Sequence, residues 1–450
     1  MTQTTDITTI QPTPGQTNLS VTNRLWLAAM CVANGLPFAL AVLLMIMFKR
    51  FGLNNSTVTY NISLLCLPWL LRPFCHLLLK KSGWSNDVWL LATELTSIVS
   101  LLLISEAIAS DLWFTFSMVL LMLLSLSSML HSIATESLYR EITADNSPVM
   151  LRPRFIFFHV LSAIFGIGFA VMMAGNIEVL TRNIHYAWTF VFRLVAAVYT
   201  LMWLYNLVKI WNRSSASAND PDIHNISDWR EMGHAFRLFF GYRSVSIGSL
   251  FFIFYLMPLG LTLSVGALFI IDSTHRGGLG LSPQEYALAC GTVGVIGIAT
   301  GSLACMRLLR CYHLSRTIVP LSLSVCVSAL AGVVLSHTHP VTLSAVNICM
   351  FIAHVAIGMA FTSFIGILSY YSCGKYRPTF FSIGISLAAL SLLLSGLYSG
   401  SLQRYYGYST YFVFALMFSA VSPFIAFVLK RYCFRHNKYP ISTSSPHPIT

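Results

Sequence analysis

Titratable side chains lie inside or at the ends of several long apolar runs. The stretch HSIATESLYRE, residues 131–141, follows the uncharged run FSMVLLMLLSLSSML. Residues three and four apart stack on a helix, so Ser132, Glu136 and either Tyr139 or Arg140 share one face, with His131 and Thr135 beside them. A face of this kind is expected to point toward protein or an aqueous cavity and away from lipid.

Glu136 has two readings on this face. It either carries a proton during transport or anchors the helix end by pairing with a nearby arginine. Arg140, Arg152 and Arg154 all follow within eighteen residues. This cluster of arginines favours an ionised, structural Glu136.

Arg72 and Glu94 lie inside two consecutive apolar runs, seven and six residues from the same end. At 1.5 Å per residue both are roughly 10 Å deep. A buried pair between them is therefore one expectation. The alternatives for Arg72 are binding of a substrate anion and snorkelling to the surface. Either way we expect Arg72 to be buried between helices and close to Glu94 or Glu136.

Other polar residues in apolar runs have weaker signals. Arg193 lies six residues inside its run, which favours snorkelling to the nearer surface. His354 shares a helix face with Asn347 and Gly358, which fits either packing or a cavity role. The candidate substrate or coupling residues are Asn34, Arg72, Glu94, His131, Glu136, Tyr139, His159, Tyr255, Asn347 and His354.

No stretch has the spacing of a catalytic or metal-binding motif. HRGGLGLSPQEY, residues 275–286, has glycines but lacks the G-K-[ST] ending of a phosphate loop. Its SPQE is better read as a helix start with Ser282 as N-cap and Glu285 reaching back. The ten cysteines form no C-x-x-C pair. We expect neither an enzyme nor a cofactor nor a metal site.

The composition requires a membrane environment for the elements that position these residues. Hydrophobic residues make up 56% of the chain and charged residues 9%, with a mean hydropathy of +0.71. An ordinary soluble domain has about 25% charged residues. About 20 apolar residues cross a bilayer, and the chain has twelve such stretches: 25–48, 57–79, 88–106, 112–136, 155–176, 187–210, 244–271, 287–310, 317–336, 341–371, 378–401 and 410–430.

The basic residues predict the orientation of these spans. Twenty of the 27 Lys and Arg residues fall on one side, five on the other and two within spans. This bias places both termini in the cytoplasm. It also explains the +12 net charge without nucleic-acid binding.

A central loop divides the twelve spans into two sets of six. The predicted organisation is a disordered tail (1–22), a six-helix bundle (23–210), a linker (211–243), a second bundle (244–432) and a tail (433–450). The linker contains a possible amphipathic helix with Trp229, Phe236 and Phe239 on its apolar side. GLPFAL in the first span and LMPLGL in the seventh suggest a repeat. This all-α layout of two six-helix repeats is typical of major facilitator transporters.

Several stretches resemble the muropeptide permeases (AmpG-like proteins), in the peptide/acetyl-CoA/drug transporter branch of that superfamily. The matching stretches occur in the family's order and are NGLPFAL (34–40), LPWLLRPFCHLLLKK (67–81), HSIATESLYRE (131–141), GGLGLSPQEYALACGTVGVIG (277–297) and SGLYSGSLQRYYGYSTYFVF (395–414). By this resemblance Arg72 matches the family's basic residue in the second helix. Glu136 matches the second acid of the fourth helix.

The chain departs from the family pattern at two acidic positions. Ser132 stands where the family has the first acid of its fourth helix, and Lys80 stands where an acid closes the motif between helices two and three. The resemblance implies a monomeric permease of the bacterial cytoplasmic membrane that imports an anhydromuropeptide or related solute, with protons. The missing acids motivate an alternative, a binding or sensor protein of the same fold that does not transport. A transporter of another small organic solute is a further alternative.

Overall fold

The computed structural model describes residues 21–143, 153–212, 228–241, 243–340, 342–372 and 376–431, and these residues form helices without any strand. The predicted tails, most of the linker, Arg152 and the side chains of Lys80 and Arg154 lie outside this part of the chain. The domain boundaries at residues 23, 210, 244 and 432 stay predictions.

The first half of the chain contains six predicted spans, two of which are divided into shorter helical segments. Its helices are α1 (Val21–Arg50), α2 (Asn55–Leu64), α3 (Leu67–Leu70), α4 (Arg72–Lys81), α5 (Asn86–Ala107), α6 (Trp113–Thr143), α7 (Pro153–Ala163), the π-helical η2 (Ile164–Ala170), α8 (Val171–Thr181) and α9 (Ile184–Trp211).

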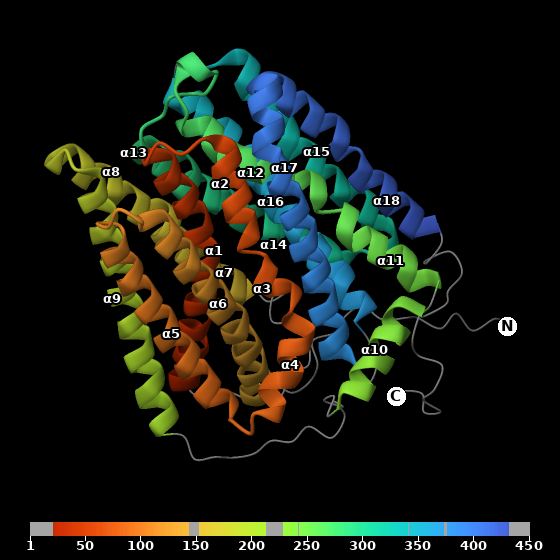
Figure 1. Cartoon of the computed structure of the whole chain (residues 1–450). Helices are drawn as coiled ribbons and strands as arrows, with labels where there is room; N and C mark the ends of the chain where they lie inside the picture. Colours follow the sequence, from red (N-terminus) through yellow and green to blue (C-terminus); the bar gives the residue numbers. More distant parts are fainter. Residues whose placement is uncertain are drawn as a thin grey trace.

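The second half of the chain follows the linker helix, which lies at one end of the bundle (Figure 1). The helices from the linker onward are α10 (Trp229–Gly241), α11 (Arg243–Phe254), α12 (Met257–Ile271), the 3₁₀ turn η3 (Thr274–Arg276), α13 (Pro283–Tyr286), the π-helical η4 (Ala287–Gly294), α14 (Val295–Cys311), α15 (Leu314–Thr338), α16 (Leu343–Tyr371), α17 (Arg377–Ser419) and α18 (Val421–Leu429).

The described helices account for twelve membrane spans. Ten helical stretches are long and apolar enough to cross a bilayer, and a bent pair, Asn55–Leu70 with Arg72–Leu79, adds an eleventh. One of the ten, Arg377–Leu429, has 53 residues and is broken at Gly407, where φ is 77°. At 1.5 Å per residue this stretch is far longer than the ~30 Å hydrocarbon core. Figure 1 shows the chain reversing direction there, so the stretch contains two spans.

The second span is bent because prolines interrupt its hydrogen bonding. Pro68 and Pro73 stand in the first turns of α3 and α4, and the two parts of the span differ in direction by 45°. Proline has no N–H to donate and restricts the residue before it. The span predicted over 57–79 therefore corresponds to a bent pair of helical segments.

The bundle has two opposite ends, named here by their residues (Figure 1). The Asp272 face contains the end of α1, the start of α2, the end of α12 and the turn at Gly407. The basic face contains the end of α4, the end of α6, the start of α17 and the linker helix α10.

Glycines bring the two halves into close contact along two seams. In the first, a Cβ on Gly396 of α17 would overlap Ser63 of α2, and the N–H of Gly400 donates to Thr59 Oγ1 at 3.1 Å. In the second, a Cβ on Gly168 of η2 would lie 3.1 Å from the carbonyl oxygen of Gly291 in η4. Only glycine permits backbones to approach this closely.

Candidate functional site

Arg72 lies fully buried between the second and fourth spans and binds the polar face of α6. Its Nη2 is 2.7 Å from Glu136 Oε1, and its Nη1 donates to Ser132 Oγ at 3.1 Å. Arg140 Nη2 lies 3.6 Å from the other oxygen of Glu136. We call these four residues the Arg72 cluster. The predicted face of Ser132 and Glu136 therefore exists, and it holds one carboxylate between two guanidinium groups.

The proposed pair between Arg72 and Glu94 is wrong, although both side chains are buried. Glu94 points toward α9, where its Oε1 accepts a hydrogen bond of 2.7 Å from Asn206 Nδ2. Asn206 Oδ1 in turn accepts from Trp26 Nε1 at 3.1 Å. Similar depth in a bilayer does not determine which way a helix face points. Here the bend before α4 brings Arg72 to α6 instead.

Three further candidates in the first half each have one buried side-chain atom without a partner. Among the described residues, Asn34 Oδ1, His131 Nε2 and His159 Nδ1 have no hydrogen-bond partner. His131 Nδ1 lies 3.3 Å from Thr93 Oγ1, and the ring of His159 stacks on Phe155 at 3.9 Å.

The remaining candidates are mostly packing residues. Tyr139 belongs to an apolar cluster with Trp26 and Phe155. Tyr255 is fully buried, and its hydroxyl lies 2.5 Å from Ser363 Oγ within the second half.

The two candidates on α16, His354 and Asn347, differ in their contacts. His354 Nδ1 bonds the carbonyl of Met350 at 2.8 Å, and a Cβ on Gly294 would lie 2.9 Å from its ring. This geometry supports the packing reading of His354. Asn347 keeps its Oδ1 unpaired within the described part of the chain.

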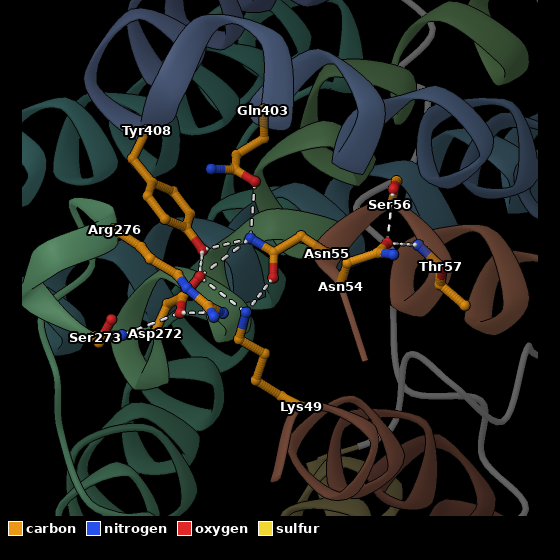
Figure 2. Close-up of polar contacts among 10 residues, drawn as sticks. All are labelled: Lys49, Asn54, Asn55, Ser56, Thr57, Asp272, Ser273, Arg276, Gln403 and Tyr408. Carbon is orange, nitrogen blue, oxygen red and sulfur yellow. Dashed lines mark hydrogen bonds and ion pairs between the residues drawn. The ribbon is translucent and has the colours of Figure 1, made fainter. Parts of the chain in front are cut away.

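A second polar cluster, which the sequence did not predict, joins the two halves at the Asp272 face. Figure 2 shows Lys49 and Asn55 of the first half directed at Asp272, Gln403 and Tyr408 of the second half. We call these five residues the Asp272 cluster. Lys49 Nζ lies 2.8 Å from Asp272 Oδ2 and 2.6 Å from Asn55 Oδ1.

Asn55 and Tyr408 complete the connections within the Asp272 cluster. Asn55 Nδ2 donates to Gln403 Oε1 and to the Tyr408 hydroxyl, both at 2.7 Å, and the Tyr408 hydroxyl donates to Asp272 Oδ2 at 3.0 Å. Helix geometry places these groups: Lys49 ends α1, Asn55 begins α2 and Asp272 caps α12. The bonds from Lys49 to Asp272 and from Asn55 to Gln403 and Tyr408 cross between the halves. The Lys49–Asn55 and Tyr408–Asp272 bonds stay within one half and orient these groups.

The electrostatics of Asp272 favour its charged form. Burial alone would raise the pKa of this carboxyl group. The hydrogen bond and positive charge of Lys49, the Tyr408 hydroxyl and the N–H of Ser273 outweigh burial and hold the pKa below its ordinary value. Arg276 Nη1 adds a cation 3.7 Å from Asp272 Oδ1.

Two ion pairs at the same end stay within the first half. Arg50 binds Glu178, and Arg193 Nη2 lies 2.7 Å from Glu106 with both side chains more than half exposed. Arg193 therefore reaches the surface, as predicted. A sequence signal for the Asp272 cluster did exist. Lys49 and Asp272 end the first span of each half, which are equivalent positions in a repeated fold.

Neither a family model nor a curated protein matches the sequence. Solved structures match its fold along most of its length. One is the nucleoside transporter NupG, with 13% identity and a TM-score of 0.67 over 91% of this chain and 99% of that one. A POT family transporter in complex with 5-aminolevulinic acid has 12% identity and a TM-score of 0.68 over 93% and 96%.

A D-xylose-proton symporter has 11% identity and a TM-score of 0.65 over 91% of this chain and 96% of that chain. At such low identities these matches establish the fold. The chain has the all-α major facilitator fold, with twelve spans in two six-helix halves. The three similar structures are transporters rather than enzymes.

Proposed function

We propose that the chain is a secondary transporter that imports an anhydromuropeptide or a related amino-sugar or peptide solute together with protons. The observation that carries this proposal is the Asp272 cluster, which ties the two halves together at one face. In this fold the solute site lies between the halves, which rock to expose it alternately on each side. A solute entering from the Asp272 face therefore requires these bonds to break.

The arrangement of charge supports a location in a bacterial cytoplasmic membrane with the basic face inward. Lys81, Arg140 and Arg377 all stand at helix ends on that face. Cytoplasmic loops of membrane proteins are enriched in such residues. With this orientation the Asp272 face is the outer one, and the described conformation is closed toward the outside. We further propose that the protein acts as a monomer.

The solute class rests on the sequence resemblance and on the Arg72 cluster. Two of the stretches that resemble muropeptide permeases supply all of this cluster, Arg72 from residues 67–81 and the other three residues from 131–141. The Arg72 guanidinium is held by two side chains of α6, so its position in the bundle is well defined. Asn34 and His131 add unpaired polar atoms that suit the hydroxyl and amide groups of an amino sugar.

Uptake into proteoliposomes tests this function. Purified protein is reconstituted, and labelled anhydromuropeptide, amino sugar and tripeptide are added with and without an inward proton gradient. We expect saturable, gradient-dependent uptake of the muropeptide. Arg193→Ala serves as a matched variant that removes an exposed guanidinium, and uptake should survive it. Folded protein that takes up none of the three solutes, with or without the gradient, would contradict the proposal.

A second candidate function is a solute-binding or sensor protein that no longer transports. Ser132 and Lys80 replace two acids that similar permeases use, and Glu136 is engaged by Arg72 and Arg140. Binding of solute by isothermal calorimetry without any uptake in the same preparation would favour this candidate. A ligand that binds the native state should also raise its melting temperature by mass action.

A further inference from the structure

The linker helix α10 is packed on the protein along one broad side. Met232, Ala235 and Phe239 on that side are buried, and Phe239 lies 5.5 Å from Phe380 of α17. Phe236 stacks on Phe74 of α4 at 5.4 Å. The helix therefore rests on one span from each half. Its position is determined by aromatic contacts on both sides of the seam.

Beside this packed side, α10 exposes aromatic and basic residues, and the Trp229 ring, at its border, also lies 6.5 Å from the ring of Phe74. Trp229 and Phe240 are 47% and 42% exposed, and the side chains of Arg230 and Arg237 are exposed as well. These positions fall on a single face of a helix. We call these four residues the α10 outer face. Exposed aromatic side chains next to arginines are typical of helices that lie in a membrane interface.

The contacts of α10 place it at the depth of the lipid headgroups. Lys81, the last residue of α4, lies with its Nζ 5.6 Å from the centre of the Trp229 ring. Tyr376, which precedes the first residue of α17, donates to Glu231 Oε1 at 3.4 Å. Ends of membrane spans lie at the boundary between hydrocarbon and headgroups. A helix tied to two such ends has the same depth.

The two carboxylates beside the α10 outer face each have a partner outside it. Asp228, just before the helix, lies 3.7 Å from Lys81, and Glu231 is bonded to Tyr376. Arg230 and Arg237 have no ion pair with any described residue. The outer face is thus positively charged without an internal counter-ion.

We propose that the α10 outer face binds the phosphate groups of anionic phospholipids in the adjacent leaflet. Trp229 and Phe240 would lie among the upper acyl chains, and the two guanidinium groups would each donate to a headgroup phosphate. Planar guanidinium groups form paired hydrogen bonds with phosphate oxygens. This proposal does not depend on the solute or on transport.

Lipid selectivity of the reconstituted protein tests it. The protein is placed in bilayers of phosphatidylcholine, and spin-labelled phosphatidylglycerol or phosphatidylcholine reports the association of each lipid with the protein surface. We expect preferential association of phosphatidylglycerol that decreases when NaCl is raised, since salt screens exposed charges. Arg230→Gln/Arg237→Gln should reduce that preference on the order of tenfold, because each basic residue near an anionic surface contributes substantially. Both side chains are exposed, so folding should be retained.

Two matched variants separate the α10 site from general surface charge. Arg310→Gln/Arg316→Gln removes two exposed arginines from other helix ends of the basic face and should leave most of the preference intact. Arg230→Lys/Arg237→Lys keeps the charge and should retain part of it. Equal losses in the two Gln variants, or no loss in the α10 variant, would overturn the proposal. So would a preference that is unaffected by salt.

Discussion

Lys49 at the end of α1 and Asp272 at the end of α12 form an ion pair of 2.8 Å that connects the two halves, with side chains only 8% and 5% exposed. A buried pair loses the hydration of both ions, so its net contribution to stability is small. Loss of one partner has a much larger effect, because the other charge stays buried without a counter-ion.

We therefore expect Lys49→Met or Asp272→Asn to lower the free energy of unfolding by about 3–5 kcal/mol. The double variant should lose less free energy of unfolding than the sum of the two single losses, which a double-mutant cycle measures. Arg193→Gln is the control: its 2.7 Å pair with Glu106 is exposed, and such pairs contribute at most about 1 kcal/mol. Equal melting temperatures for Lys49→Met and Arg193→Gln would contradict the assigned role of burial.

The pH dependence of stability should reflect Asp272. Its folded pKa lies below the ordinary value, so its contribution is present above the unfolded pKa of about 3.9 and is lost as pH falls through the folded value. The stability difference between wild type and Asp272→Asn should be constant from about pH 5 to 7 and should shrink below about pH 4. Thermal unfolding across this range checks it. A difference that persists unchanged to the lowest pH would refute the assignment.

Arg72 should matter more than Arg193, both for folding and for uptake. Arg72→Ala leaves Glu136 facing Arg140 alone and removes the bond to Ser132. Arg72→Lys should be intermediate, because one ammonium cannot reproduce two separate guanidinium contacts. Protein yield, melting temperature and initial uptake rate at equal protein levels provide the comparison with Arg193→Ala. If Arg193→Ala is the more harmful change, this ranking is wrong.

Glu136 is expected to be a structural residue rather than the proton carrier. It is held between Arg72 and Arg140, so Glu136→Gln should reduce folded yield while the pH profile of the remaining uptake stays unchanged. A variant that folds normally and no longer responds to a proton gradient would assign coupling to Glu136.

Glu94 provides a test of a buried hydrogen bond whose partner, the Asn206 amide, carries no charge. Its Oε1 accepts from Asn206, and its Oε2 has no partner among the described residues. Glu94→Gln keeps an acceptor for Asn206 and should be tolerated, whereas Glu94→Leu leaves a buried amide unpaired and should cost about 1–3 kcal/mol. Similar melting temperatures for the two variants would show that the Asn206 bond does not stabilise the bundle.

Hydropathy predicted the spans well because lipid imposes a simple rule on composition. The two closing spans, predicted at 378–401 and 410–430, are separate in the structure as well, because the stretch is broken at Gly407. The capping box at Ser282 and Glu285 was also predicted, since it is a local pattern. Local chemistry and burial in lipid can both be evaluated from short windows of sequence.

The partners of the buried charges could not be predicted in the same way. Depth along a span is visible in sequence, but rotation about the helix axis and the bend before α4 are set by packing. Arg72 therefore meets Glu136 and not Glu94. Lys49 and Asp272, 223 positions apart, each look like an ordinary surface charge at a helix end. Their burial arises only when the two halves meet.

The contact of Gly168 with Gly291 has a different consequence from the Asp272 cluster. A cluster of polar bonds can be weakened one bond at a time, so its strength can be tuned by small substitutions. The glycine contact has no side chain to exchange, because a methyl group on Gly291 would overlap the backbone of Gly168 and Ile167. This backbone contact can serve as a pivot about which one half rotates against the other. Mutational scanning should then give graded effects at the cluster and an abrupt loss at Gly291.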